Sequence, residues 1–207
     1  MTPLINPTIE QSLREKILPE LSQGRQNFDL NHTEAVVHWM KQLLVNGEIS
    51  SVIDSQVMIT AAYAHDWGYV GLFKGVNSDD PKVIKQRKPL HMQLGAKKIK
   101  QLIEEKLQIF FSSQQADLVV HLVNVHDEVE ELQIAEELLL MEADTLGMLD
   151  VSFVTPTFTA QENLRFVQNE VISRRFPKFT HPFARLSGEI LLQTRLKYYG
   201  QSIRSEL

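Results

Sequence analysis

The segment VIDSQVMITAAYAHD, residues 52–66, ends a mostly apolar run with a histidine and an aspartate. Met58, Ala61, Ala62 and His65 follow helical spacing and share one face. Because most of this predicted helix is apolar or aromatic, we expect it to be central. It therefore delivers an imidazole and a carboxylate into the interior, and its small alanines allow neighbouring helices to approach closely.

Helical periodicity also dominates the rest of the chain, and no segment is a good candidate for a sheet. We predict an all-α fold, a compact multi-helix bundle, in one domain of 207 residues with a core at about 25–150 and a C-terminal helical extension at 151–207. Predicted helices cover roughly residues 8–21, 31–45, 51–66, 90–107, 113–126, 134–150, 160–175 and 183–199. Asn31 and either Ser112 or Ser113 are the expected caps, and Trp67 to Pro89 is predicted to be a long loop.

Composition restricts the chemistry that the chain can carry. Cysteine is absent, so a metal must be held by His, Asp or Glu, which suits Mn, Fe, Zn, Ni or Mg. The chain is 43% hydrophobic, yet no uncharged apolar run is long enough to predict a membrane span. The N-terminus lacks the features of a secretory signal, so we expect a cytoplasmic protein. A net charge of −5 argues against binding to nucleic-acid polymers.

Asp144 lies in LLLMEADTLGMLD, residues 138–150, with apolar or small residues on the same helical face. An ionised carboxylate buried there needs a partner, because desolvation costs several kcal/mol. No Lys or Arg occurs between Leu107 and Leu164, so the countercharge must come from elsewhere in the chain, from a metal or from protonation. A divalent cation shared with His65 and Asp66 would meet this need.

Two histidines on one predicted helix differ in their neighbours. His126 follows an apolar helical stripe, whereas His121 has a more mixed face. We therefore place His126 in the site and His121 at its edge. His38 and His181 are interpreted as ordinary structural residues, since His38 lies about 240° round the helix from His32.

Together these residues form the pattern H…HD…H…H…D, which resembles the HD superfamily of metal-dependent phosphohydrolases. The pieces that carry the resemblance are His32-Thr-Glu-Ala-Val36, Ala61-Ala-Tyr-Ala-His65-Asp66-Trp-Gly68, His91-Met-Gln-Leu-Gly95-Ala96, Leu122-Val-Asn-Val-His126-Asp127 and Glu142-Ala-Asp144-Thr-Leu146. They span roughly residues 25–150. Two positions depart from the family: Tyr69 replaces the lysine of its frequent HDxGK motif, and Glu142 replaces the first aspartate of its frequent DAD.

The resemblance implies an HD-domain bundle that binds one or two divalent ions. One ion would be bound by His32, His65, Asp66 and Asp144. In a second site, Asp66 would bridge the two ions, and His91 and His126 would complete the ligand set.

The resemblance also implies roles in catalysis. Asp66 would orient a water molecule, and His121, if near the site, would protonate a leaving group or hold a phosphate oxygen. Arg87 and Lys88 are candidates for contact with substrate phosphate. The loop from Trp67 to Pro89 would then form a lid or a substrate wall.

Structural roles are the alternative for each of these residues. His65 and Asp66 are also compatible with a capped helix end, and Asp144 with a salt bridge to an Arg or Lys of another segment. Arg87 and Lys88 are also typical of a solvated surface. The acidic residues within 127–137 are interpreted as a solvated face, and the basic, aromatic stretch within 174–199 as helix surface and core aromatics or as a dimer contact.

The leading hypothesis is a metal-dependent phosphohydrolase that acts on a small phosphate ester, such as a nucleotide or dinucleotide. A di-iron HD-type oxygenase and a non-catalytic metal- or nucleotide-binding module are the alternatives. The expected partners are a small phosphorylated substrate and, in a homodimer, a second copy of the chain, but no membrane.

Overall fold

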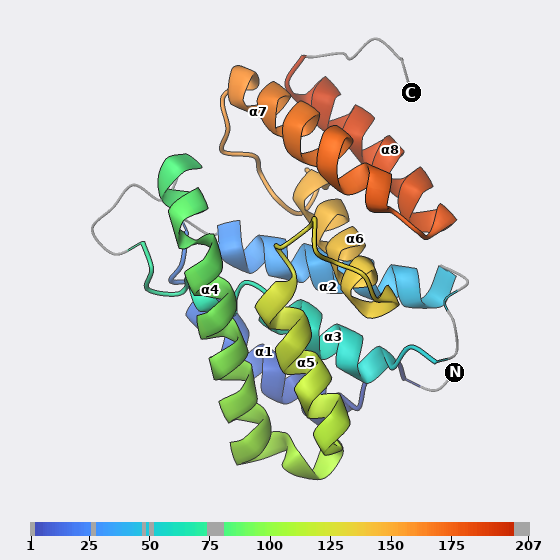
Figure 1. The fold of residues 1–207 in the computed structure, drawn as a ribbon. Helices are drawn as coiled ribbons and strands as arrows, with labels where there is room; N and C mark the ends of the chain where they lie inside the picture. Colours follow the sequence, from blue (N-terminus) through green and yellow to red (C-terminus); the bar gives the residue numbers. More distant parts are fainter. Residues whose placement is uncertain (1–2, 26–27, 47–48, 50–51, 74–80, 201–207) are drawn as a thin grey trace.

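The computed structural model describes residues 3–25, 28–46, 49, 52–73 and 81–200. Over these residues it contains eight α-helices and no strand, which confirms the predicted all-α fold (Figure 1). The helices are α1 (Pro7–Leu21), α2 (Phe28–Asn46), α3 (Ser55–Ala64), α4 (Pro81–Leu102), α5 (Ser113–Val125), α6 (Ala135–Leu149), α7 (Ala160–Phe166) and α8 (Pro182–Tyr198). Short 3₁₀ and π segments extend or join them: η1 (Trp67–Tyr69), η2 (Ile103–Leu107), η3 (Gln108–Phe110), η4 (Val167–Arg175) and η5 (Phe176–Lys178). None of the helices in the described ranges has both the length and the apolar character needed to cross a membrane.

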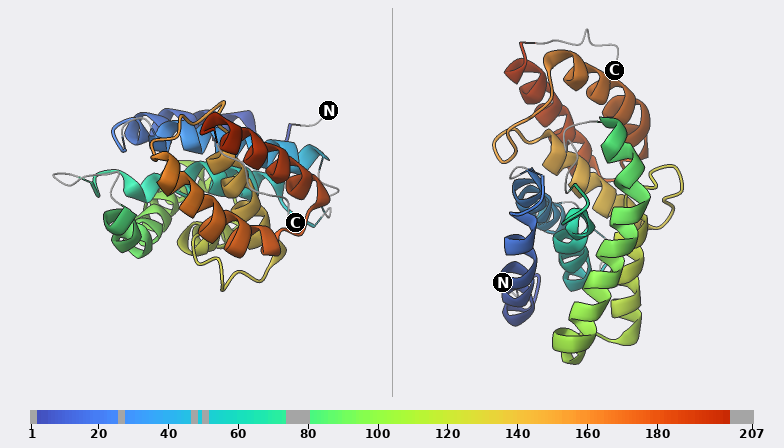
Figure 2. Two further views of the ribbon diagram at one scale, coloured as in Figure 1. Left: turned by 90° about the horizontal axis from the view of Figure 1, so that it is seen from above. Right: turned by 90° about the vertical axis from the view of Figure 1, so that its left-hand side faces the viewer.

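Helix α3 lies at the centre of the bundle, as its sequence predicts. Every residue from Val57 to Ala64 is buried, and α3 packs against α1, α2, α5 and α6. Its alanines present little side chain, so these neighbours approach closely. Helices α4 and α5 run side by side along one flank, and α2 packs along α6 (Figure 2).

Side-chain caps fix where two of the inner helices begin. Asp54 accepts hydrogen bonds from the backbone N–H groups of Gln56 and Val57 at the start of α3. Ser112 and Gln115 form a capping box at the start of α5, and Ser112 is thus one of the two predicted caps. The caps therefore fix the starts of the two helices that end at His65 and His126.

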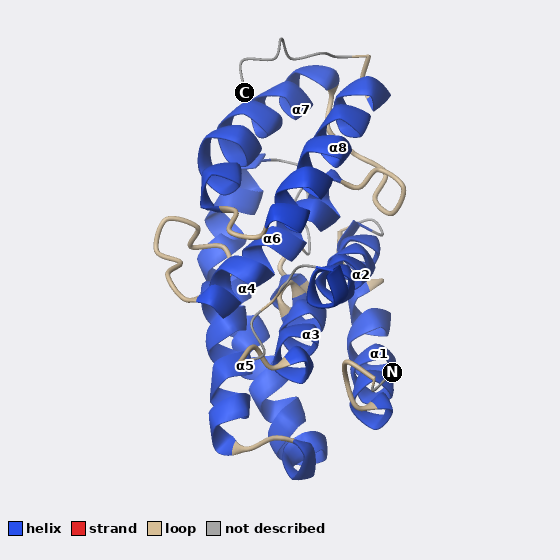
Figure 3. Ribbon diagram, turned by 90° about the vertical axis from the view of Figure 1, so that its right-hand side faces the viewer, coloured by secondary structure: helices blue, strands red, loops and turns tan. Residues whose placement is uncertain are grey.

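The C-terminal extension (residues 151–200) packs at one end of the molecule, where α7 and α8 lie together (Figure 3). Its small apolar cluster consists of Leu149, Val167, Val171, Phe176, Leu192 and Leu196. Arg195, only 4% exposed, donates to Asn163 Oδ1 over 2.6 Å and to the carbonyl oxygen of Met148 over 2.7 Å. Apolar packing and buried hydrogen bonds therefore both attach the extension to α6, while the one-domain organisation stays a prediction.

Three predicted helix boundaries are wrong. Helix α3 begins at Ser55 rather than near Ser51, because Asp54 caps it. Helix α2 begins at Phe28 rather than near Asn31, so His32 lies in its second turn and not in its first. Helix α4 begins at Pro81, and Pro89 lies inside it. Proline suits the first turn, where its missing N–H has no intrahelical partner, and the exposed position of Pro89 limits the cost of the backbone hydrogen bond lost there.

The predicted long loop from Trp67 to Pro89 is therefore largely helical where it is described. It starts with η1 and ends with the first turns of α4, and residues 74–80 lie outside the described residues. The expected lid is thus replaced, over residues 81–89, by a helical wall.

Candidate metal centre

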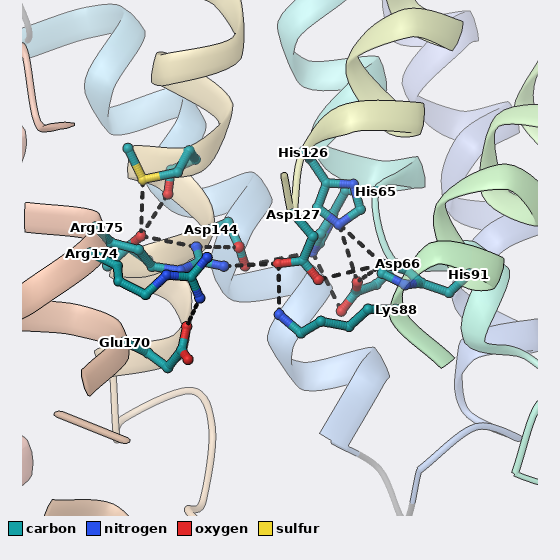
Figure 4. Close-up of polar contacts among 12 residues, drawn as sticks. His65, Asp66, Lys88, His91, His126, Asp127, Asp144, Glu170, Arg174 and Arg175 are labelled. Atoms are coloured by element: carbon teal, nitrogen blue, oxygen red, sulfur yellow. Dashed lines mark hydrogen bonds and ion pairs between the residues drawn. The ribbon is translucent and has the colours of Figure 1, made fainter. Parts of the chain in front are cut away.

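Six side chains meet in the interior near the junction of the bundle and the C-terminal extension, and Figure 4 labels all of them except His32. They are His32 of α2, His65 and Asp66 at the end of α3, His91 of α4, His126 at the end of α5 and Asp144 of α6. None of the six is more than 6% exposed. The structure thus brings together all six residues that the sequence suggested as ligands.

The first cluster consists of His32, His65 and Asp144. The Nε2 atoms of the two histidines are 3.3 Å apart. Asp144 Oδ1 lies 2.9 Å from Nε2 of His32 and 3.9 Å from Nε2 of His65. Asp66 approaches the same two nitrogens with its Oδ2 atom, at 3.7 and 3.6 Å.

The second cluster consists of His91, His126 and the other oxygen of Asp66. The two Nε2 atoms are 3.2 Å apart, and Asp66 Oδ1 lies 3.4 Å from that of His91 and 3.6 Å from that of His126. Asp66 therefore directs one carboxylate oxygen to each cluster. This is the bridging position that the family resemblance implied.

Backbone carbonyls fix the rings of two of these histidines. Nδ1 of His65 lies 2.8 Å from the carbonyl oxygen of Ala62, and Nδ1 of His126 lies 2.9 Å from that of Val123. Because a carbonyl only accepts hydrogen bonds, each neutral ring carries its proton on Nδ1. The lone pair on Nε2 then points to the centre, as in a metal-bound histidine.

The geometry of both clusters fits a divalent ion. Ligands that bind one ion at about 2.0–2.2 Å must lie roughly 3–4 Å from one another. The distances within each cluster, from 2.9 to 3.9 Å, fall in this range. Two imidazole nitrogens with facing lone pairs also repel each other unless a proton or a cation lies between them. The buried His/Asp clusters are therefore able to hold a metal ion.

A chain of ion pairs surrounds the ligands (Figure 4). Arg175, 3% exposed, donates from Nη1 to Asp144 Oδ2 over 2.7 Å and from Nη2 to Asp127 Oδ1 over 2.9 Å. Lys88 lies 3.1 Å from the same Asp127 oxygen. The distant salt bridge considered for Asp144 thus exists, but it uses Oδ2, while Oδ1 contacts His32.

Arg25 and Tyr69 border the centre on another side. Arg25 Nη2 lies 3.6 Å from Asp66 Oδ2, and its guanidinium stacks 4.2 Å above the ring of Tyr69. The Tyr69 ring lies flat on His91, with centroids 3.9 Å apart. Tyr69, which departs from the family motif, therefore acts here as a packing surface for a ligand histidine and for an arginine.

The local electrostatics keep His65 and Asp144 in the forms that bind metal. Burial lowers the pKa of His65 to about 4, so this imidazole is neutral at pH 7. Desolvation alone would raise the pKa of Asp144, but Arg175 and the contact with His32 hold it well below its usual value. The centre thus offers a neutral imidazole and an ionised carboxylate.

A cavity of about 400 Å³ opens over the ligands. It is lined by Arg25, Phe28, His32, Asp66, Tyr69, Ile84, Lys88, His126, Asp127, Asp144, Met148, Phe158, Phe166, Glu170, Arg174 and Arg175. Lys88, a predicted phosphate contact, lines this cavity. Arg87 does not, and its buried Nε has no hydrogen-bond partner in the described part of the chain.

The structure does not bring His121 to this cavity. Its Nε2 atom lies 2.7 Å from Glu137 Oε1, its side chain is 47% exposed, and it is not among the lining residues. His126 follows His121 by five positions, which turns the two side chains well over 90° apart round α5. The prediction that His121 lies at the edge of the site is therefore wrong.

Sequence reasoning missed several residues of the cavity. Asp127 was interpreted as part of a solvated acidic face, but its side chain is only 9% exposed and pairs with two cations. The signal was present, because Asp127 directly follows His126 as Asp66 follows His65. Arg174 and Arg175 were interpreted as helix surface, and no local pattern marked Arg175 as buried.

A close approach between two elements positions His91. A Cβ atom at Gly68 would overlap the carbonyl oxygen of His91 and crowd the backbone of Gly95. Only glycine therefore allows η1 to lie directly on α4 at this point. This contact brings His91 next to Asp66.

Fold and site together define an all-helical protein with a buried His/Asp centre that is able to hold a metal ion. The family model of the HD domain matches residues 29–149, more than half of the 207 residues. The chain therefore belongs to the HD domain family, which confirms the resemblance seen in the sequence. No curated protein and no solved structure matches the chain. The matched segment contains all six candidate ligands, whereas Arg175 lies outside it.

Proposed function

We propose that the protein is a metal-dependent phosphohydrolase that acts on a small phosphate ester, such as a nucleotide or dinucleotide. The HD domain is typical of metal-dependent hydrolases. The observation that carries the proposal is the position of Asp66 at the base of the cavity. Each of its two carboxylate oxygens faces a different pair of histidines, and cationic side chains are among the cavity lining.

The six candidate ligands would hold one or two divalent ions, with Mn, Fe, Ni, Zn and Mg as the candidates. His32, His65 and Asp144 would hold one ion, His91 and His126 a second, and Asp66 would bridge them. When bound, the metal would neutralise charge on the phosphoryl group and lower the pKa of a coordinated water. Asp66 would orient that water toward phosphorus.

The charge of the cavity supports an anionic substrate. Its described lining contains four carboxylates (Asp66, Asp127, Asp144 and Glu170) and four cations (Arg25, Lys88, Arg174 and Arg175), so these charges cancel. Each divalent ion would then give the cavity a net positive charge. A dianionic phosphate ester is the small ligand that best matches such a surplus.

Lys88 is the cation best suited to contact the phosphate. It lines the cavity, and its ammonium group has three donors, of which the pair with Asp127 uses one. Asp127 is itself held by Arg175, so the ammonium group has a defined position. This arrangement favours a phosphate ester over an uncharged substrate.

The test combines metal analysis with a substrate screen. Purified protein should contain a divalent metal ion and should release phosphate from a panel of phosphorylated metabolites when Mn, Fe, Ni, Zn or Mg is added. His65→Gln should lower both metal content and activity. His38→Gln is the matched control, because His38 lies outside the centre, and it should change neither. Absence of both metal and metal-stimulated activity contradicts the proposal. Iron with oxygen consumption, or tight nucleotide binding without turnover, favours one of the two alternatives.

A further inference from the structure

The cavity has an outer part that the metal chemistry does not use. Beyond the ligands and cations it is lined by Ile84, Met148, Phe158 and Phe166, each of them half-buried. We infer that this outer part binds the organic group of the substrate and selects a flat, largely apolar group such as a nucleobase or another aromatic ring. The inference rests on the proposed function and extends it to residues outside the matched HD segment.

Both walls of the cavity run from an apolar side chain to charged side chains. On α4, Ile84, Lys88 and His91 follow one another at helical spacing, from an apolar side chain to a cation and then to a candidate ligand. Across the cavity, Phe166 is followed at the same spacing by Glu170 and Arg174. A molecule with a phosphate at one end and an apolar group at the other matches both walls.

The apolar wall is held in place by α8. Tyr199, directly after this helix, donates from its hydroxyl group to the carbonyl oxygen of Phe158 over 2.9 Å. Arg195 donates to the carbonyl oxygen of Met148 over 2.7 Å, and its guanidinium lies 5.3 Å from the centre of the Phe166 ring. Three wall residues are thus fixed by two side chains from the end of the chain, so the wall is preformed.

The aromatic rings leave surface for a ligand. Phe158 and Phe166 contact each other at 5.6 Å between centroids with an angle of 56°, which leaves part of each ring facing the cavity. Aromatic groups bind such surfaces through burial and through edge-to-face or offset contacts. An alkyl or small sugar phosphate would leave these rings uncovered.

Glu170 and Arg174 lie between the apolar wall and the inner cations. They form an ion pair with each other, and each is more than one third exposed. Glu170 has a carboxylate that can accept hydrogen bonds from hydroxyl groups. A polar linker, such as the sugar of a nucleoside phosphate, therefore fits between the aromatic wall and the metal centre.

The experiment compares two kinds of phosphate ester in the Mn²⁺-loaded full-length protein. Adenosine 5′-monophosphate and p-nitrophenyl phosphate carry aromatic groups, whereas glycerol 3-phosphate does not. Phe158→Ala and Phe166→Leu should raise KM for the aromatic esters by about tenfold, the scale for loss of one apolar contact, and leave KM for glycerol 3-phosphate within about twofold. Phe153→Ala is the matched control, because Phe153 belongs to the same extension but packs on His38 outside the cavity, and it should change neither KM.

Direct binding separates this inference from the proposed function. Calorimetric titration of adenosine 5′-monophosphate into the Mn²⁺-loaded protein needs no turnover. If the nucleotide binds and loses affinity in Phe158→Ala, while no ester of the metabolite panel is hydrolysed, the inference about the outer part of the cavity is supported and the phosphohydrolase assignment fails. The opposite outcome is that both ester classes are hydrolysed with equal KM, and that Phe158→Ala and Phe166→Leu change neither KM nor the melting temperature. That outcome overturns the inference, whereas the phosphohydrolase assignment stands.

Discussion

Arg175 Nη1 lies 2.7 Å from Asp144 Oδ2, and this contact joins the C-terminal extension to a candidate metal ligand of the HD segment. Nη2 of the same guanidinium donates to Asp127 Oδ1 over 2.9 Å, and Nη1 also donates to Thr145 Oγ1 over 3.2 Å. One planar side chain thus fixes Asp144 on one side and Asp127 on the other. The orientation of Asp144 toward His32 depends on this contact.

Removal of the Arg175 guanidinium should weaken metal binding. We expect Arg175→Ala to lower metal affinity by about 10- to 100-fold, the range for loss of a group that orients a ligand, and Arg175→Lys to recover part of it. Competition with a metal-sensitive dye measures the affinity. Arg195→Lys is the control, because Arg195 is equally buried in the extension but bonds Asn163 and Met148. Equal metal affinity in Arg175→Ala and the parent protein would disprove the role.

Substitutions in the two clusters should differ in how many ions they remove. If Asp66 bridges two ions, His91→Ala should retain one ion per chain, whereas Asp66→Ala should retain none tightly bound. Elemental analysis after dialysis against a weak chelator gives the stoichiometry. Retention of the parent stoichiometry in Asp66→Ala would exclude a bridging carboxylate at this position.

Substitution of His121 should have little effect on catalysis. Its ring bonds Glu137 on the outside of α5 and does not reach the cavity, so His121→Ala should keep kcat/KM within about twofold. Steady-state kinetics with the best substrate of the screen measures this. A loss of a hundredfold or more would show that His121 moves to the substrate and would restore it as a catalytic acid.

His181 should make the stability of the extension depend on pH. Its hydrogen bond to the fully buried Glu142, 2.7 Å long, raises the pKa of His181 above its ordinary value of 6.5. A raised pKa in the folded state gives a contribution that is complete below pH 6.5 and is lost as the pH rises through the folded value. The melting temperature of the parent protein should therefore exceed that of His181→Gln more at about pH 6 than at about pH 8.5.

Glu142→Gln provides the comparison for this prediction. If the pH dependence arises from the His181–Glu142 contact, His181→Gln should have the same effect at both pH values in the Glu142→Gln background. A difference that persists there would assign the pH dependence to another group.

The sequence was sufficient to predict the inner part of the site. His65 and Asp66 end an apolar helix, and the apolar stripes around His126 and Asp144 point them to the core; the structure places all of them there. Helical periodicity and a histidine or aspartate on the buried face are local signals. These signals can be read from the sequence without knowing which helices become neighbours.

The outer part of the site depends on contacts that no local pattern encodes. Asp127 belongs to an acidic run that favours exposure, and it is buried because Lys88 and Arg175 arrive from distant segments. Arg174 and Arg175 look alike in the sequence, yet their side chains are 37% and 3% exposed. Both lie at the end of η4, where adjacent residues point in different directions, and only Arg175 points into the core.

Pro89 was misleading for a different reason. A proline usually ends a helix, so it suggested that the helix of His91 starts after it. Pro81 instead opens α4, and the exposed Pro89 is accommodated inside. The error matters, because the turns before Pro89 carry Ile84 and Lys88 into the cavity.

The extension packs on α6, so contacts of the folded molecule cross the end of the matched HD segment. Cutting the chain after residue 149 would strip Asp127 and Asp144 of their guanidinium partner and uncover Leu149 at the same time. Two carboxylates without their guanidinium partner and an exposed apolar patch would result. In this molecule the segment after residue 149 and the candidate metal ligands therefore depend on each other.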